Sequence, residues 1–186
     1  MGLREKKKTF GYRERDEAAR AAFLEAFQAY AAEDVVYVDE AGLDDTEAYA
    51  YGWCDRSERF YDLKRGHRTE RVSMVAGWCN RSILAPLTFK GYCNTALIEG
   101  WIEHCLVKEL SPGQVVVLDN ASFHKSDRIR DLIEQAGCQV VFLPPYSPDL
   151  NKIEKFWARI KHYVRKTLHQ FDNLWDALDN AFRVLS

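Results

Sequence analysis

The sequence lacks the features that mark several large classes of protein. No run of eighteen or more apolar residues occurs among its 186 positions, which excludes a membrane-spanning helix. The N-terminal stretch Met-Gly-Leu-Arg-Glu-Lys-Lys-Lys leads into no apolar segment, so we expect no secretory signal. There is also no internal repeat and no low-complexity stretch. The composition, 47% hydrophobic and 29% charged, is that of one globular domain with a single well-buried core.

Cysteine is sparse and irregularly placed. The five cysteines are odd in number and none forms a Cys-x-x-Cys pair; they are Cys54, Cys79, Cys93, Cys105 and Cys138. This pattern indicates neither a zinc site nor a disulfide framework. We therefore expect reduced, buried thiols in a cytoplasmic protein.

The chain also lacks an excess of positive charge, but its basic residues are concentrated in one place. The formal net charge of −2 argues against a protein that coats nucleic acid in general. Between positions 152 and 166, however, Glu154 is the only acid among Lys152, Lys155, Arg159, Lys161, Arg165 and Lys166. This segment predicts a helix that meets phosphates along one face. A solvated helix surface without a ligand is the alternative.

Hydrophobic periodicity in the first half predicts a helix followed by an antiparallel meander. The helix is expected over 14–32, and the strands over 35–39, 49–61, 71–79 and 83–89. Pro86 within the last strand indicates an edge or a bulge. A further helix, capped by Asn94 or Thr95, is expected to run to about Leu110.

The second half alternates strands and helices. Strands are expected over 115–119 and 139–143, and helices over 126–136, 151–168 and 173–185. Ser126, Gly137 and Asp172 are the expected caps. The strand–helix–strand crossover implies a parallel pair. Antiparallel strands followed by alternating helices and strands have the element order of the ribonuclease-H-like fold, so we predict that α/β mixed sheet flanked by helices.

Three acidic residues stand where packing alone does not require them. Asp39 closes the apolar run Val-Val-Tyr-Val, Asp119 closes Val-Val-Val-Leu, and Glu154 opens a helix. In sheets with parallel strands, functional groups collect beyond the carboxyl ends of the strands. Carboxylates suit magnesium, and two ions ~3.5–4 Å apart can activate the attacking oxygen and stabilise the leaving oxygen of a phosphodiester. The three acids therefore predict a divalent-metal site.

Each of these acids also has a structural alternative. A strand-end aspartate can make an Asx turn or cap the next helix. Asn151 and Glu154 fit a capping box, in which the glutamate reaches back to the cap. Against this, Glu154 lies on the flank of the expected apolar stripe, in line with Lys161 and Arg165, and Ala158 offers it no partner one turn on. We therefore favour the ligand role.

Other candidates are weaker. His124 is close in sequence to Asp119 and could contact phosphate, but a hydrogen-bonded structural histidine fits equally well. The basic cluster around Arg68 reads as a hairpin tip that either contacts DNA or is simply solvated. Asp44 and Asp45 occupy a loop where acids are common and are minor candidates for metal binding.

Together these residues resemble the DDE transposases. The nearest likeness is to the bacterial insertion-sequence family IS six-thirty, which is allied to the mariner elements. The matching stretches are Val-Tyr-Val-Asp-Glu at 36–40, Val-Leu-Asp-Asn-Ala-Ser-Phe-His-Lys at 117–125 and Leu-Pro-Pro-Tyr-Ser-Pro-Asp-Leu-Asn-Lys-Ile-Glu-Lys-Phe-Trp at 143–157. The 34 residues that separate Asp119 from Glu154 are typical of that family. Many relatives have proline where Lys152 stands, a departure that leaves the acids in place.

The resemblance implies a polynucleotidyl transferase that uses Mg²⁺, with Mn²⁺ as a substitute. Asp39, Asp119 and Glu154 would be both catalytic residues and metal ligands. Water would attack the phosphodiester at the element's end, and the freed 3′-hydroxyl would attack target DNA, typically at a TA dinucleotide. No covalent intermediate is required, which agrees with the lack of a nucleophile motif. The expected DNA contacts are Arg68, His124, Arg159, Lys161 and Arg165.

The resemblance also bears on domains and partners. Residues 1–33 would form a basic segment and one helix, and residues 34–186 the catalytic domain. Full-length relatives carry a helix-turn-helix region that reads the terminal inverted repeats, and we expect no such reader in this chain. A homodimer and a fused or separately encoded reader remain open. The expected location is the bacterial cytoplasm, on the nucleoid when DNA is bound, with no membrane partner.

Two other functions compete with an active recombinase. One is a non-catalytic DNA- or partner-binding remnant that regulates a complete transposase, although a decaying copy has no reason to keep all three acids. The other is a cellular ribonuclease-H-like nuclease, and the segment Tyr-Ser-Pro-Asp-Leu-Asn speaks against it.

Overall fold

A mixed sheet forms the centre of the molecule. The computed structural model describes residues 13–46, 55–57, 59, 61, 67 and 70–186. Within them, the sheet has the order β3-β2-β1-β4-β5. Its strands are β1 (Val35–Asp44), β2 (Arg71–Cys79), β3 (Ser82–Phe89), β4 (Val115–Leu118) and β5 (Gln139–Phe142). β1, β2 and β3 pair antiparallel, whereas β1, β4 and β5 pair parallel, which confirms the predicted ribonuclease-H-like sheet.

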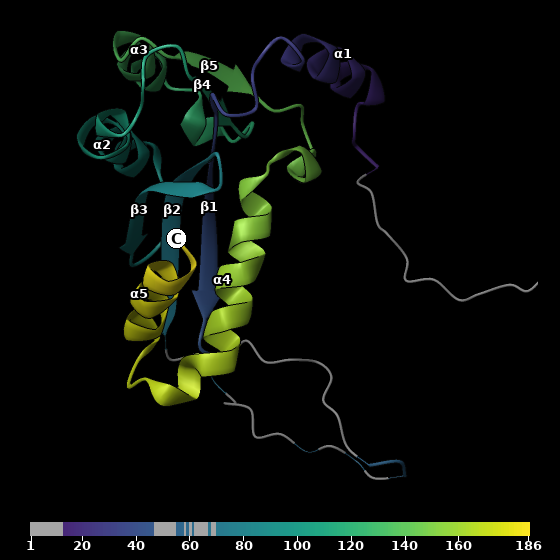
Figure 1. Ribbon diagram of the computed structural model, residues 1–186, viewed down its shortest axis with the longest axis vertical. Helices are drawn as coiled ribbons and strands as arrows, with labels where there is room; N and C mark the ends of the chain where they lie inside the picture. The colour runs from purple at the N-terminus through teal and green to yellow at the C-terminus, as the bar shows by residue number, and fades with distance from the viewer. Residues whose placement is uncertain (1–12, 47–54, 58, 60, 62–66, 68–69) are drawn as a thin grey trace, which may run out of the picture.

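Helices cover both faces of the sheet. They are α1 (Glu17–Phe27), α2 (Thr95–His104), α3 (Asp127–Gln135), α4 (Ile153–Thr167) and α5 (Leu174–Leu185). Short 3-10 segments connect them: η1 (Leu106–Lys108), η2 (Ser122–His124), η3 (Pro148–Leu150) and η4 (Leu168–Gln170). Figure 1 shows α4 running alongside β1, with α5 beside it. None of the helices in the described ranges is long and apolar enough to cross a membrane.

Strand alternation divides the core into two clusters. Val35 and Tyr37 of β1 pack with α4 and α5 on one face. Val36 and Val38 pack with α2 and α3 on the other. Because successive side chains of a strand point to opposite faces, the same alternation determines toward which face the side chains of Asp39 and Asp119 point.

The first half of the chain differs from the predicted meander. β1 does not end at Asp39 but continues to Asp44, and its second half is the antiparallel partner of β2. Most of the strand predicted over 49–61 lies outside the described residues, and those described within it, 55–57, 59 and 61, are not in a strand. Pairing with β2 extends β1 through Glu-Ala-Gly-Leu-Asp, a segment whose own strand propensity is weak.

Predicted edges and caps are partly confirmed. β3 is an edge strand with a register shift opposite it, as Pro86 indicates. Asn94 caps α2 by accepting a hydrogen bond from the Leu97 amide, but the helix ends at His104 and a 3-10 turn follows. The expected cap of α5, Asp172, is wrong: Asn173 accepts the hydrogen bond from the Asp176 amide instead.

Candidate active site

The three predicted acids line a single hollow of about 440 Å³, here called the acidic hollow. Asp39 lies in β1 two residues beyond the last parallel pair, Tyr37 with Val117, and Asp119 follows β4 directly. Both continue the alternation of Val35, Tyr37 and Val117, so both take the face covered by α4. Glu154 comes from the first turn of α4 on that face. Three elements far apart in sequence thus bring their carboxylates to one edge of the sheet.

The start of α4 shows that Glu154 is not part of a capping box. Lys152 occupies the cap position, and no side chain forms a capping hydrogen bond there. The Asn151 amide instead donates to the Val38 carbonyl of β1 at 3.4 Å, in a buried contact. Since the alternative capping role is absent, the Glu154 carboxylate is exposed at the wall of the hollow.

Burial and like charges together determine the electrostatics of the acidic hollow. Burial first, and then the charges of Glu154, Glu40 and Asp119 in that order, together raise the pKa of Asp39 to about 8. A cation between such carboxylates would relieve this repulsion. Among the residues that the structure describes, no three histidine, cysteine or acidic side chains are already gathered closely enough to hold a metal ion. The acids would therefore have to draw together around a cation to share it.

His124 connects the acidic hollow to a further acid, Glu40. The imidazole is fully buried; its Nδ1 lies 2.6 Å from the Asp119 carboxylate and its Nε2 lies 2.7 Å from that of Glu40. Burial opposes protonation, but the two carboxylates outweigh it and raise the pKa of His124 to about 9. The same hydrogen bond lowers the pKa of Asp119 against the effect of its own burial.

This arrangement favours a structural role for His124 over the DNA contact that the sequence suggests. Both ring nitrogens are engaged, and no part of the side chain is exposed. Glu40 has no assigned role at the sequence level, although it stands beside Asp39 in the segment Val-Asp-Glu. Its carboxylate also hydrogen-bonds the thiol of Cys93, whose pKa burial and this carboxylate raise to about 12.

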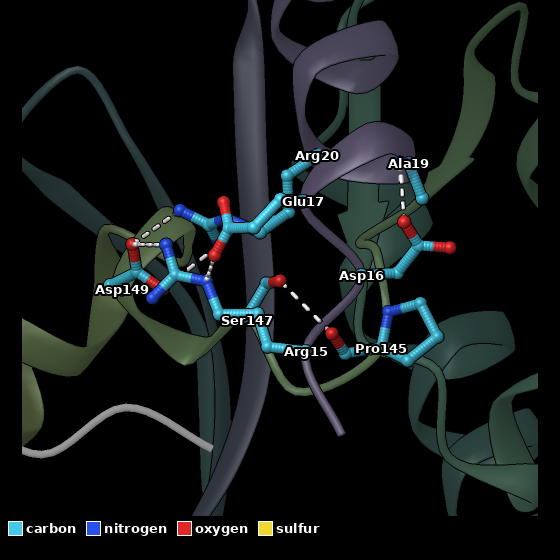
Figure 2. Close-up of polar contacts among 8 residues, drawn as sticks. All are labelled: Arg15, Asp16, Glu17, Ala19, Arg20, Pro145, Ser147 and Asp149. Atoms are coloured by element: carbon cyan, nitrogen blue, oxygen red, sulfur yellow. Dashed lines mark hydrogen bonds and ion pairs between the residues drawn. The ribbon is translucent and has the colours of Figure 1, made fainter. Parts of the chain in front are cut away.

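A second contact that sequence reasoning missed braces the segment before Glu154. Arg20 of α1 donates two hydrogen bonds to the Asp149 carboxylate of η3, at 3.0 and 2.8 Å. Figure 2 shows the guanidinium groups of both Arg15 and Arg20 directed at this carboxylate. Arg20 is buried, and its hydrogen bonds lower the pKa of Asp149. The pair joins α1 to the turn that leads into α4, across 129 positions of sequence.

The predicted DNA contacts are placed unevenly. Arg159 is exposed on α4, with its guanidinium 6.0 Å from the Phe156 ring centroid. Lys161 and Arg165 lie further along the same helix and are half-buried. Arg68 falls outside the described residues. A role in DNA binding stays a prediction for each of them.

The sheet topology and the placement of the acids define a ribonuclease-H-like domain. More narrowly, residues 34–175 match the model of a family described as DDE superfamily endonuclease, and the chain belongs to that family. No curated protein has a significantly similar sequence.

Solved structures of the mariner transposase Mos1 share the fold. The Mos1 paired-end complex with Mn superposes with a TM-score of 0.70 at 17% identity, covering 98% of this chain and 65% of that one. The Mos1 strand transfer complex gives 0.68 at 16% identity and covers 100% of this chain and 65% of that one. The Mos1 catalytic domain gives 0.53 at 14% identity, with coverages of 89% and 86%. The chain thus spans about two thirds of the Mos1 chain in these DNA complexes.

Proposed function

We propose that this chain carries the catalytic domain of a transposase that cleaves DNA at the ends of an insertion sequence and joins them to a target. The single observation that carries the proposal is the convergence of Asp39, Asp119 and Glu154 on one hollow. Membership of the DDE superfamily endonucleases supports DNA strand cleavage as the reaction. The Mos1 structures that share the fold include a complex with a transposon end and a strand transfer complex, which supports DNA as the substrate class.

The residues of the acidic hollow fit hard divalent cations. Three carboxylates supply the oxygen ligands that Mg²⁺ and Mn²⁺ take. Burial and the neighbouring acids raise the pKa of Asp39, and a bound cation would oppose both effects. We assign Asp39, Asp119 and Glu154 as the ligands. Ions bound there would activate the attacking oxygen and stabilise the leaving oxygen of the phosphodiester. Mos1 structures with Mn and with Mg support this choice of metals.

The surrounding residues hold the acids in place for this chemistry. The hydrogen bond from His124 keeps Asp119 ionised and fixes the direction of its carboxylate. Asn151 ties the start of α4 to β1, and so sets the distance between Glu154 and Asp39. Arg159 and Lys161 of α4 offer cations to the DNA backbone beside the hollow.

We further propose that the chain belongs to the IS six-thirty branch, with residues 34–186 as the catalytic domain. The 34-residue interval between Asp119 and Glu154 and the segment Tyr-Ser-Pro-Asp-Leu-Asn support this branch. Recognition of the element's ends would fall to a helix-turn-helix portion that is fused or separately encoded. A reading frame for such a portion beside this one, between inverted repeats bounded by TA, would establish the branch.

Metal-dependent nicking of supercoiled plasmid tests the proposed reaction. With Mg²⁺ or Mn²⁺ the protein should convert supercoiled plasmid to nicked circles, and EDTA should stop the conversion. Asp119→Asn should lower the rate by roughly 10³-fold or more, because it removes one ligand charge. Asp131→Asn makes the same chemical change on the exposed face of α3 and should leave the rate unchanged. Full metal-dependent activity in a correctly folded Asp119→Asn protein would contradict the assignment.

A further inference from the structure

A second hollow opens beside the acidic hollow. It measures about 320 Å³ and is lined by Asn120, Lys125, Ser126, Arg130 and Phe142. Asn120 and Lys125 belong to the walls of both hollows, so the two are adjacent. No carboxylate lines this second hollow, here called the basic hollow. A surface that is acidic at the three carboxylates therefore turns basic within a few residues.

The two cations of the basic hollow form no ion pair with the residues that the structure describes. Lys125 and Arg130 are exposed, and neither makes an ion pair within the part of the chain that the structure describes. The guanidinium of Arg130 lies 5.9 Å from the Phe142 ring centroid, which holds it over the hollow. Phe142 is the last residue of β5, so the cation stands at the same edge of the sheet as Asp119.

Another arginine of α3 behaves differently. Arg128 binds the Glu103 carboxylate of α2 at 2.6 Å and lies 4.0 Å from that of Glu99. The Arg128 guanidinium is therefore engaged in an ion pair that joins α3 to α2. Among the described residues, Lys125 and Arg130 have no such acidic partner.

We propose that the basic hollow holds the backbone of the DNA strand that leads to the three acids, with Lys125 and Arg130 on its phosphates. This inference rests on the proposed function, because it takes DNA to be the substrate. The placement suits an anionic strand, which the acidic hollow alone would repel. Lys125, which borders both hollows, would meet the phosphate nearer the acids, and Arg130 one further away. These contacts reach the backbone and not base edges, so they carry affinity without sequence preference.

The salt dependence of DNA binding tests this inference. Anisotropy of a fluorescent duplex is measured over a range of KCl concentrations in EDTA, for wild type, Lys125→Gln, Arg130→Gln and Arg128→Gln. Loss of one phosphate contact should weaken binding roughly five- to tenfold at 0.1 M salt and reduce the slope of log K against log salt by about 0.9. We expect this for Lys125→Gln and Arg130→Gln on two duplexes of different sequence. Arg128→Gln removes the same charge from α3, the helix that carries Arg130, and should change neither quantity.

Charge-preserving variants separate charge from packing. Arg130→Lys and Lys125→Arg should keep the wild-type slope, because the phosphate contact needs only a cation there. If the two glutamine variants match Arg128→Gln in affinity and slope, the inference is overturned. It is also overturned if they weaken binding without changing the slope.

Failure of this inference is distinguishable from failure of the proposed function. If wild type nicks plasmid but Lys125→Gln and Arg130→Gln bind DNA as wild type does, only the assignment of the basic hollow to DNA binding is overturned. A wild type that shows the expected slopes but nicks no DNA, with any divalent metal, keeps the basic hollow as a DNA site and overturns the proposed reaction. A wild type that binds no DNA at low salt overturns both.

Discussion

At Asp39, a carboxylate is partly buried and surrounded by charges of its own sign. Burial, Glu154, Glu40 and Asp119 all act in the same direction and raise its pKa to about 8. Such a residue destabilises the fold whenever it is ionised without a cation. Its presence at the centre of the acidic hollow is therefore better explained by function than by stability.

The pH dependence of stability without metal follows from this shift. The pKa of Asp39 is about 8 in the folded protein and 3.8 in the reference state, so the folded protein holds the proton more tightly. The free energy of unfolding must then fall as pH rises between these values. Between pH 5 and 6.5 we expect a fall of up to about 1.4 kcal/mol per pH unit from this group. Asp39→Asn should abolish it, which urea unfolding in EDTA at the two pH values can measure.

Between pH 5 and 6.5, the other groups with shifted pKa values contribute little to the difference in pH dependence between wild type and Asp39→Asn. The pKa of His124 is raised from 6.5 to about 9, so its contribution to stability is lost mainly above pH 6.5, and any loss below that pH is common to wild type and Asp39→Asn. Asp119 and Asp149 have lowered pKa values, and their contributions are lost only at more acidic pH. An equal loss of stability in wild type and Asp39→Asn would mean that Asp39 does not carry the shift.

At the residue scale, the sequence singles out the three acids that line the acidic hollow but not the residues that contact them. The strand ends and the helix flank indicate Asp39, Asp119 and Glu154, because each stands where alternation or helical period gives a polar residue no core role. The contact of His124 with Asp119 spans only five residues and is a local possibility. Its contact with Glu40 spans 84 residues and depends on the pairing of β1 with β4, which no local pattern specifies.

At the scale of elements, α1 serves as a brace for the turn before α4. Its N-cap, Asp16, and its aromatic residues Phe23 and Phe27 account for its formation and for its packing on the core. The ion pair of Arg20 with Asp149 then fixes η3, three residues before the helix that carries Glu154 begins at Ile153. α1 itself lies before residues 34–175, which match the endonuclease family, yet it supports the turn that leads to Glu154.

Breaking the Arg20–Asp149 pair should therefore affect both stability and activity. Arg20→Ala should lower the free energy of unfolding by about 1–3 kcal/mol, since it removes two charge-assisted hydrogen bonds, one partner of which is half-exposed. Asp149→Asn should also destabilise, and the double variant should cost less than the sum of the two. Plasmid nicking should fall in parallel. Urea unfolding of the four proteins gives the coupling free energy.

Glu17 provides the control for this cycle. Its side chain is 74% exposed and lies 3.7 Å from Arg20, so Glu17→Gln should change stability by no more than about 0.5 kcal/mol. If the effects of Arg20→Ala and Asp149→Asn are simply additive, the brace does not act through this pair.

At the scale of the whole molecule, the order of elements determines what the sequence can predict. Alternating apolar runs and helical stripes indicate the mixed sheet, and β2 begins and ends where its pattern predicts. The second half of β1 has no such pattern, since its strand form comes from pairing with β2. The cap of α5 is wrong for a similar reason: Asp172 and Asn173 are neighbouring polar residues that can both cap a helix, and no local pattern decides between them. The three acids meet in one hollow because β1 pairs with β4 and α4 packs on β1, and no local sequence pattern specifies either contact.

The most direct test of the central claim is a count of the metal ions that the three acids hold. Mn²⁺ uptake is measured by electron paramagnetic resonance in the presence of a DNA duplex, with DNA alone as the blank. Wild type and Asp131→Asn should each take up two ions, as a two-metal site requires. Asp39→Asn, Asp119→Asn and Glu154→Gln should each lose at least one while remaining folded by circular dichroism. Undiminished uptake by a folded protein that carries all three substitutions would contradict the account.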